Sequence, residues 1–80
     1  MMIDKRLASV ILRELGLDSF PLEDSTKAFE VPGWDSLRHA SILAAVEDEY
    51  AIRFKSMEVM RLKDIGELQR LVERKLSAPK

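Results

Sequence analysis

Cysteine is absent from this sequence, and histidine, tryptophan and tyrosine occur once each. Without cysteine the chain can form no disulfide bond and no thiolate metal site, and a single histidine cannot build a zinc site unaided. Any thiol chemistry must therefore use a thiol that the chain does not encode. Glycine and proline are also scarce, at three residues each, which is typical of an ordered helical chain rather than a disordered one.

A long hydrophobic run is missing as well. No stretch approaches the roughly 20 apolar residues that a membrane-spanning helix needs, although 46% of the residues are apolar. The short apolar run near the N-terminus is flanked by acids and bases, and no small-residue cleavage site follows it, so we expect no secretory signal. These absences predict a cytoplasmic protein that does not enter membranes.

The length allows one domain, which we place at residues 1–80 with a frayed tail at 77–80. A chain of this size buries only roughly 60–65% of its unfolded surface, which leaves no room for a separate catalytic domain. The net charge is −1, but residues 1–52 carry five basic and ten acidic side chains, whereas residues 53–80 carry eight basic and four acidic ones. This asymmetry of −5 against +4 indicates either two distinct faces or simply solvated helix surfaces.

Hydrophobic periodicity predicts an all-α protein with three main helices, one short helix and a long loop between the first two. The first helix should span Ile3 to Leu15 and end at Gly16. The second should begin at Asp35 or Ser36 and end at Tyr50 or Ala51. A short helical turn at residues 56–60 and a last helix capped by Asp64 should follow.

Several side chains are expected in the core. In the second helix the predicted buried face consists of Ala40, Leu43, Val46 and Tyr50. The 19-residue segment between the first two helices has loop composition, and its length requires anchors, for which we expect Leu17, Phe20, Leu22, Phe29, Val31 and Trp34. The short turn should be capped by Ser56 and should fill gaps with Met57, Val59 and Met60. The apolar stripe of the last helix should be Ile65, Leu68, Leu71, Val72 and Leu76.

The motif Asp35-Ser36-Leu37 stands at the predicted start of the second helix. Ser36 could be a nucleophile, because His39 follows three residues later, but the hydrolase elbow, a preceding strand and an enclosed site are missing. Either Asp35 or Ser36 could simply cap the helix. Capping alone does not explain why a long, anchored loop ends in a tryptophan and a helix cap at this point. A third interpretation is that Ser36 is a modification site.

The whole pattern resembles the acyl carrier protein family and the related peptidyl carrier domains. The resemblance runs from Ile3 to Leu76 and depends on "GWDSL" before a helix that ends "VEDEYAIRF" ahead of a short third helix. It implies that Ser36 receives 4′-phosphopantetheine from coenzyme A through a separate phosphopantetheinyl transferase. The arm would then carry acyl groups as thioesters, and the chain itself would not be an enzyme. A helix N-terminus favours an attached phosphodiester.

The resemblance also implies roles for the neighbouring residues. Asp35 would cap the helix and could help to place the metal and coenzyme A phosphates during transfer, while no metal is expected to reside in the protein. Leu37 would be an outward-facing contact for partner enzymes. Further partner contacts are expected on the second helix, at Arg38, Ala44, Glu47 and Asp48.

Arg38 and His39 depart from the acidic residues that are common in the family at this helix. With the modest net charge, they indicate a specialised carrier of a lipid, polyketide or related pathway rather than the housekeeping carrier of fatty acid synthesis. Arg38 could also pair with the phosphodiester, and His39 is interpreted as a surface residue. The expected partners are the transferase and the enzymes that load and use the acyl group, and the carrier should be a monomer.

Two alternatives stay open: an aminoacyl or peptidyl carrier, or a small helical module that binds nucleic acid or protein. Acidic residues 47–49 argue against nucleic acid, because phosphate would repel them. The sequence identifies neither the cargo nor the pathway. It also does not decide whether the cargo lies between the helices, although Ala40, Ala44 and Ala45 would leave room.

Overall fold

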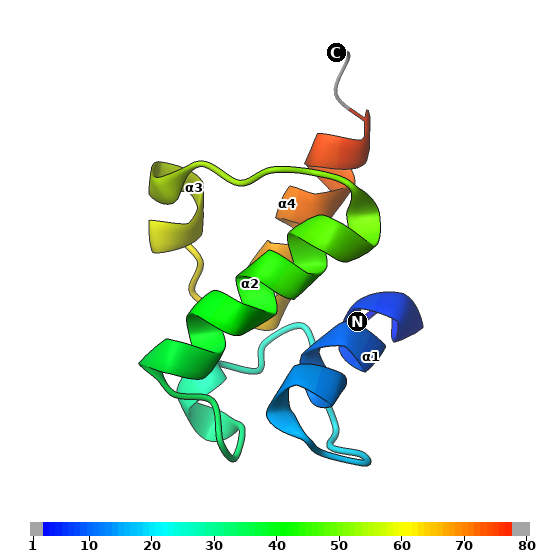
Figure 1. Ribbon diagram of the computed structural model, residues 1–80, viewed down its shortest axis with the longest axis vertical. Coiled ribbons are helices and arrows are strands. Elements are labelled where there is room, and N and C mark those ends of the chain that lie inside the picture. Colours follow the sequence, from blue (N-terminus) through cyan, green and yellow to red (C-terminus); the bar gives the residue numbers. More distant parts are fainter. Residues whose placement is uncertain (1–2, 78–80) are drawn as a thin grey trace.

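The computed structural model describes residues 3–77, and this part of the chain contains four α-helices and one 3₁₀-helix (Figure 1). These elements are α1 (Lys5–Leu15), η1 (Ala28–Glu30), α2 (Ser36–Tyr50), α3 (Ser56–Met60) and α4 (Ile65–Ser77). The prediction of an all-α protein with three main helices and one short one is confirmed. No helix within the described residues is long and apolar enough to cross a membrane.

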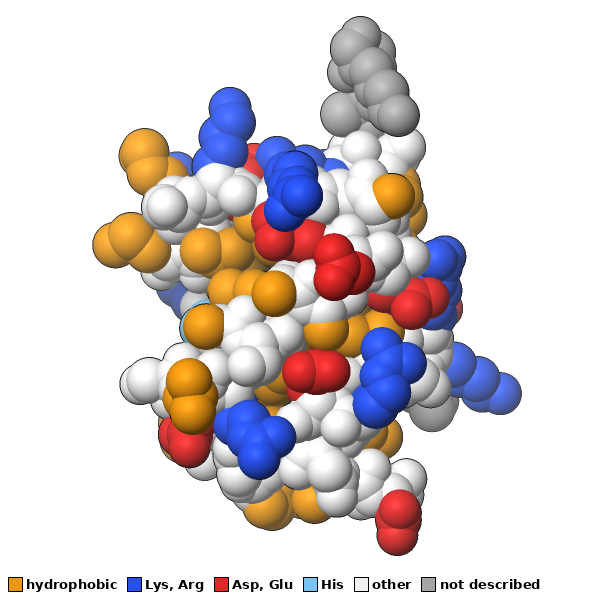
Figure 2. All heavy atoms as spheres, in the orientation of Figure 1, with side chains coloured by type: hydrophobic (Ala, Val, Ile, Leu, Met, Phe, Trp, Pro, Cys, Tyr) orange, Lys and Arg blue, Asp and Glu red, His pale blue; other side chains and the backbone are white. Residues whose placement is uncertain are grey.

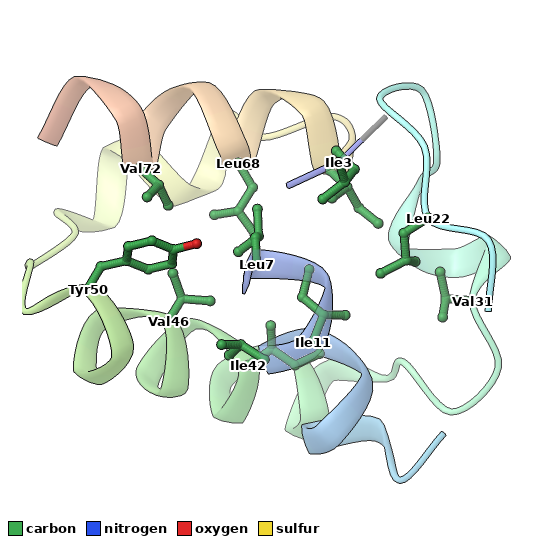
Figure 3. Close-up of a cluster of buried hydrophobic side chains, with 12 residues drawn as sticks. Ile3, Leu7, Ile11, Leu22, Val31, Ile42, Val46, Tyr50, Leu68 and Val72 are labelled. Atoms are coloured by element: carbon green, nitrogen blue, oxygen red, sulfur yellow. The ribbon is translucent and has the colours of Figure 1, made fainter. Parts of the chain in front are cut away.

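One hydrophobic core joins α1, α2, α4 and the long loop (Figure 3). In Figure 3, Leu68 and Val72 of α4 point toward Val46 and Tyr50 of α2. Two buried loop residues, Leu22 and Val31, extend the same cluster. The core therefore fixes α2, the helix that begins at Ser36, against the rest of the fold.

Helix α1 ends at Gly16, as the sequence predicted. Gly16 takes a left-handed conformation with φ 71°, and the backbone N–H of Leu17 donates to the carbonyl oxygen of Leu12 at 3.0 Å. These bonds satisfy carbonyls that a helix end leaves unpaired. The predicted start was wrong by two residues, because Ile3 contributes to the core while lying ahead of the helix.

The predicted bounds of α2 are confirmed, but its predicted buried face was partly wrong. Ala40 is exposed, whereas Ile42, Val46 and Tyr50 are buried. A helix turns about 100° per residue. The two steps of three residues from Ala40 to Val46 therefore leave the Ala40 side chain about 120° away from the buried direction of Val46. Steps of four, as between Ile42 and Tyr50, keep the stripe close to one face.

The far end of α2 is joined to α1 by an arginine. The Nε of Arg6 lies 2.8 Å from the Glu49 carboxylate, and its guanidinium lies 4.4 Å from the centre of the Tyr50 ring. The Tyr50 hydroxyl donates to the Asp4 carboxylate at 3.3 Å. Burial is the main cause that raises the pKa of the Tyr50 phenol. These contacts hold the end of α2 that is remote from Ser36.

The long loop is bound to the start of α4 by backbone hydrogen bonds. The N–H of Ile65 donates to the Thr26 carbonyl, and the N–H of Gly66 to the Asp24 carbonyl, both at 2.9 Å. The Asp64 carboxylate accepts from the Glu67 N–H at 2.9 Å, which confirms Asp64 as the cap. The loop thus pairs N–H groups that a helix N-terminus would leave open, and this pairing explains how so long a loop stays ordered.

Several predicted core positions were wrong because no element between residues 3 and 77 covers them. Phe29 is 80% exposed, and Met57, Met60 and Leu76 are 66%, 82% and 54% exposed. Figure 2 shows hydrophobic side chains projecting at the edge where α3 lies. Ser56 is the first residue of α3 rather than its cap. The N-cap position belongs to Lys55, and no side-chain oxygen at that position accepts a hydrogen bond from the helix. Ser77 is still helical, and the remainder of the predicted tail lies outside the described residues.

Candidate functional site

A tight turn leads the chain into the Asp35-Ser36-Leu37 motif at the start of α2. In the segment "VPGW", the N–H of Trp34 donates to the Val31 carbonyl at 3.2 Å, and Gly33 has φ 82°. Proline followed by glycine in the left-handed region matches a type II turn, in which only glycine is comfortable at the third position. The turn reverses the chain, so that Trp34 faces the core and Asp35 stands at the helix start.

Asp35, and not Ser36, caps α2. The Asp35 carboxylate accepts from the backbone N–H of Arg38 at 2.8 Å, as an N-cap does. Ser36 is the first helical residue and is exposed. Leu37 follows with 76% of its surface exposed. Because capping uses the aspartate, the Ser36 hydroxyl is left at the surface and is available for modification.

The single histidine pairs with the single tryptophan. The indole N–H of Trp34 donates to Nδ1 of His39 at 3.0 Å, and the ring centres lie 6.1 Å apart. When Nδ1 accepts a hydrogen bond, the neutral ring carries its proton on Nε2. His39 then has no lone pair left with which to deprotonate Ser36, so the arrangement does not support a serine nucleophile.

Sequence reasoning missed this pair, and it placed His39 on the surface, whereas the residue is half-buried. The predicted role of Trp34 as an anchor is consistent with its packing against the core cluster. The spacing of five residues carries no helical signal, because Trp34 lies before the helix and His39 within it. Only the geometry of the turn brings the two rings together.

Two hollows adjoin the Trp34–His39 pair. The outer hollow, about 440 Å³, opens at the surface and is lined by Ala28, Phe29, Trp34, Asp35, Ser36 and His39. The second hollow, about 40 Å³, shares Ala28, Trp34 and His39 with the first and is lined further by Leu43, Leu62, Lys63, Asp64, Ile65 and Leu68. Ser36 therefore borders a space large enough for a ligand-sized group, whereas the second hollow is far smaller.

The other predicted contact residues on α2 divide into two kinds. Ala44 and Asp48 are exposed. Arg38 instead donates from Nη1 to the Glu14 carbonyl at the end of α1. Glu47 is half-buried and accepts from the Phe54 N–H at 2.7 Å, which fixes the segment between α2 and α3. Leu37, Ala44 and Asp48 are thus exposed to solvent. The side chains of Arg38 and Glu47 instead form hydrogen bonds to other segments of the protein.

Comparison with known proteins agrees with this geometry. The family model described as a phosphopantetheine attachment site matches residues 5–72. The chain is also similar to the solution structure of a holo acyl carrier protein from Geobacter metallireducens, with 34% sequence identity and a TM-score of 0.83. That similarity covers 89% of this chain and 82% of the other. No curated protein matches the sequence.

The chain belongs to the phosphopantetheine-binding acyl carrier protein family. It is therefore a carrier and not an enzyme, and its cofactor is covalently bound 4′-phosphopantetheine. The residues present suit such a group, because an exposed hydroxyl at the first residue of α2 borders an open hollow of about 440 Å³. The same helix end offers backbone N–H groups that favour a phosphodiester.

Proposed function

We propose that Ser36 is the attachment residue and that the protein carries acyl groups as thioesters between enzymes of a specialised lipid or polyketide pathway. The observation that supports this assignment most directly is the position of the Ser36 hydroxyl. It is exposed beside an aspartate that already caps α2, and it borders the outer hollow. An attached arm would leave the helix cap intact and would extend into solvent or into the hollow.

The modification requires little chemistry from the protein itself. In the transfer, Ser36 Oγ forms a bond to the phosphorus of coenzyme A that carries the pantetheine. The bond between that phosphorus and the leaving nucleotide phosphate breaks, and the serine proton passes to a base of the transferase. The chain contributes a presented hydroxyl and the nearby Asp35 carboxylate, which could help to place the metal and the phosphates during transfer.

The test is transfer followed by intact mass measurement. Purified protein incubated with coenzyme A, magnesium and a promiscuous phosphopantetheinyl transferase should gain one phosphopantetheinyl group, and Ser36→Ala should gain none. Ser56→Ala is a matched control, since Ser56 is also exposed and also the first residue of a helix; this variant should be modified normally. A folded wild type that stays unmodified, or a Ser36→Ala variant that is still modified, would refute the assignment.

We further propose that partner enzymes dock along α2. Leu37 lies directly after the attachment residue with 76% of its surface exposed, and Ala44 and Asp48 continue toward the far end of the helix. Contact through Arg38 or Glu47 would compete with bonds that these side chains make within the fold. The partners would be the transferase and the enzymes that load and use the acyl group.

The specialised role is supported by the charge pattern. The first turns of α2 carry Arg38 and His39, and the net charge is only −1, so the surface offered to partners is less acidic than the family commonly presents. We propose a monomeric domain spanning residues 1–80 in the cytoplasm, where coenzyme A is available. An aminoacyl or peptidyl cargo is the alternative, and an intact mass of the protein isolated from its source would identify the attached group.

A further inference from the structure

A groove between α3 and α4 has no part in the proposed attachment of the arm. It measures about 430 Å³, a volume in which the side chains of a bound segment have room. Its lining combines apolar and charged side chains, namely Met57, Glu58, Arg61, Leu62, Glu67, Arg70 and Arg74. Of the residues from 3 to 77, none that belongs to α2 or to the loop before it lines this groove.

The walls of the groove are held in place by ion pairs. The Lys75 ammonium of α4 lies 2.8 Å from the Glu58 carboxylate of α3. Arg70, also on α4, lies 3.0 Å from the Asp24 carboxylate of the long loop. A groove whose walls are already fixed loses little conformational freedom when a ligand enters it, so the structure favours binding without rearrangement.

Two arginines in the lining are not used by the fold. Within residues 3–77, Arg61 and Arg74 are exposed and form no salt bridge. The lining acids are both engaged, because Glu58 pairs with Lys75 and Glu67 accepts the Lys63 backbone N–H at 3.2 Å. Residues 53–80 carry eight basic and four acidic side chains. The groove therefore lies in a positively charged region, with two guanidinium groups free to bind an anion.

The kind of base in the lining indicates what that anion is. All three bases that line the groove are arginines, whereas the nearby Lys55, Lys63 and Lys75 lie outside the lining. A guanidinium presents its N–H groups as a planar fork, which binds a carboxylate or phosphate through two parallel hydrogen bonds. The lining is thus better suited to a specific contact with such a group than to a general attraction of anions.

An apolar surface lies in the same groove. Met57 is 66% exposed and Leu62 is half-buried, and a flexible methionine adapts to apolar side chains of different shapes. A ligand that used only phosphate groups would leave this surface uncovered. A protein segment that carries carboxylates together with an apolar side chain matches both features of the lining.

We propose that the groove between α3 and α4 binds an acidic segment of a partner protein. Carboxylates of the segment pair with Arg61 and Arg74, and an apolar side chain of the segment packs on Met57 and Leu62. Arg61 ends α3 and Arg74 lies on α4, so a narrow segment between the two walls reaches both arginines, which a flat lipid surface does not. A partner held here leaves α2 and the arm free for an enzyme.

The test uses a synthetic acidic peptide as the probe. Isotope-labelled protein is titrated at low salt with a short peptide of aspartates and glutamates around one leucine, and binding is followed by NMR. Shift changes should gather at residues 57–62 and 67–74, and binding should weaken as salt is added. The same peptide with asparagine and glutamine in place of its acids should not bind, and the peptide with alanine in place of leucine should bind more weakly.

A pair of charge variants tests the arginines. Arg61→Gln combined with Arg74→Gln should raise the Kd of the peptide about five- to tenfold, because two exposed ion pairs are lost. Arg13→Gln combined with Arg53→Gln is the matched control, since it removes the same charge from exposed positions outside the lining. The control should change the Kd by less than about twofold.

A second pair of variants tests the apolar contact. Met57→Gln should weaken the binding of the leucine peptide. Met60→Gln should not, because Met60 is 82% exposed and lies outside the lining. All these substitutions are at exposed positions, so the variants should fold, and their melting temperatures provide the check.

Several outcomes would overturn the inference. Peptide binding that persists unchanged in the double variant of Arg61 and Arg74, or equal binding of the uncharged peptide, would show that the groove does not recognise carboxylates. Sedimentation with vesicles of phosphatidylcholine and phosphatidylserine, without peptide binding, would indicate a lipid surface instead. Shift changes in the groove on raising the concentration of the protein alone, with sedimentation as a dimer, would assign the groove to a second copy.

The groove and the attachment site can fail independently. Ser36→Ala should bind the acidic peptide as tightly as wild type does, since Ser36 does not line the groove. Wild-type protein that is modified normally but does not bind the peptide would overturn this inference alone. Protein that binds the peptide but cannot be modified would overturn the proposed attachment and leave the groove as assigned.

Discussion

Arg38 donates a hydrogen bond from Nη1 to the backbone carbonyl oxygen of Glu14, and this bond ties the first turn of α2 to the last turn of α1. A guanidinium at a helix C-terminus also interacts favourably with the unpaired carbonyls there. In this arrangement Arg38 helps to position the N-terminal end of α2, where Ser36 lies two residues earlier.

Replacing Arg38 should weaken the fold without blocking modification. We expect Arg38→Met to lower the free energy of unfolding by about 0.5–1.5 kcal/mol through loss of the hydrogen bond, as measured by urea denaturation followed by Trp34 fluorescence. Arg53→Met is the control, since its guanidinium is largely exposed and lies 3.9 Å from the Glu47 carboxylate; the change there should stay within about 0.5 kcal/mol. Normal stability with slower phosphopantetheine transfer would instead place Arg38 at the transferase interface.

The cap and the possible transfer role of Asp35 can be separated by two substitutions. Asp35→Ala removes the acceptor for the Arg38 N–H and should lower the free energy of unfolding by about 1 kcal/mol. Asp35→Asn keeps a capping side chain and should retain most of the stability, but it removes the negative charge. Thermal unfolding and the transfer rate are measured on both. A slow transfer in a stable Asp35→Asn protein would show that the carboxylate itself serves the transferase, and an unchanged rate would restrict Asp35 to capping.

Local chemistry allowed the helix bounds to be predicted from the sequence, except for the start of α1. Gly16, Asp35 and Asp64 act on their nearest backbone neighbours, so their effect is readable without knowing the fold. The exposed position of Ser36 follows from the same reasoning, since it lies at a helix start after a Pro-Gly turn. The bounds of α2 and the cap of α4 agree with these expectations.

For the residues whose burial or contacts were predicted wrongly, the outcome depends on distant parts of the chain. Phe29 and Met60 are apolar, but whether they are buried is decided by which elements pack over η1 and α3, and nothing in the described residues covers them. The predicted face of α2 was wrong because Ala40 and Ile42 point in directions about 160° apart on the helix. The Trp34–His39 bond likewise depends on the exact path of the turn, which no sequence period encodes.

Gly66 should be intolerant of alanine although it lies in a helix. Alanine in place of glycine within a helix usually stabilises by about 0.5–1 kcal/mol. Here a Cβ would overlap the Asp24 side chain and lie 2.6 Å from the Asp24 carbonyl oxygen, which accepts the Gly66 N–H. We therefore expect Gly66→Ala to destabilise by about 1–3 kcal/mol, as measured by urea denaturation.

A double variant separates the two parts of this clash. Adding Asp24→Ala to Gly66→Ala removes the overlapping carboxylate but leaves the carbonyl in place. The double variant should recover only part of the lost stability. Full recovery would show that the loop backbone moves freely away from α4, contrary to the hydrogen bonds that join them.

Glu58 provides a pH-dependent link between α3 and α4. Its carboxylate accepts from the Lys75 ammonium at 2.8 Å and from the Lys55 backbone N–H at 2.7 Å. The bond from Lys75 is the main cause that lowers the pKa of the Glu58 carboxyl, and the Lys55 N–H adds to it. Because the folded protein holds the ionised form more strongly, this group stabilises the fold above the unfolded pKa of about 4.3.

The stabilisation should disappear as the pH falls through the lowered pKa of folded Glu58, since both states are then protonated. Thermal unfolding of wild type and Glu58→Gln across a pH series should show the wild type more stable at neutral pH and the two proteins converging in acid. Glutamine keeps an acceptor for the Lys55 N–H, so the difference reports on the charge. Glu73→Gln, at an exposed position on α4, is the control and should follow wild type throughout. A difference at Glu58 that persists unchanged in acid would mean that the side chain acts through packing rather than through its charge.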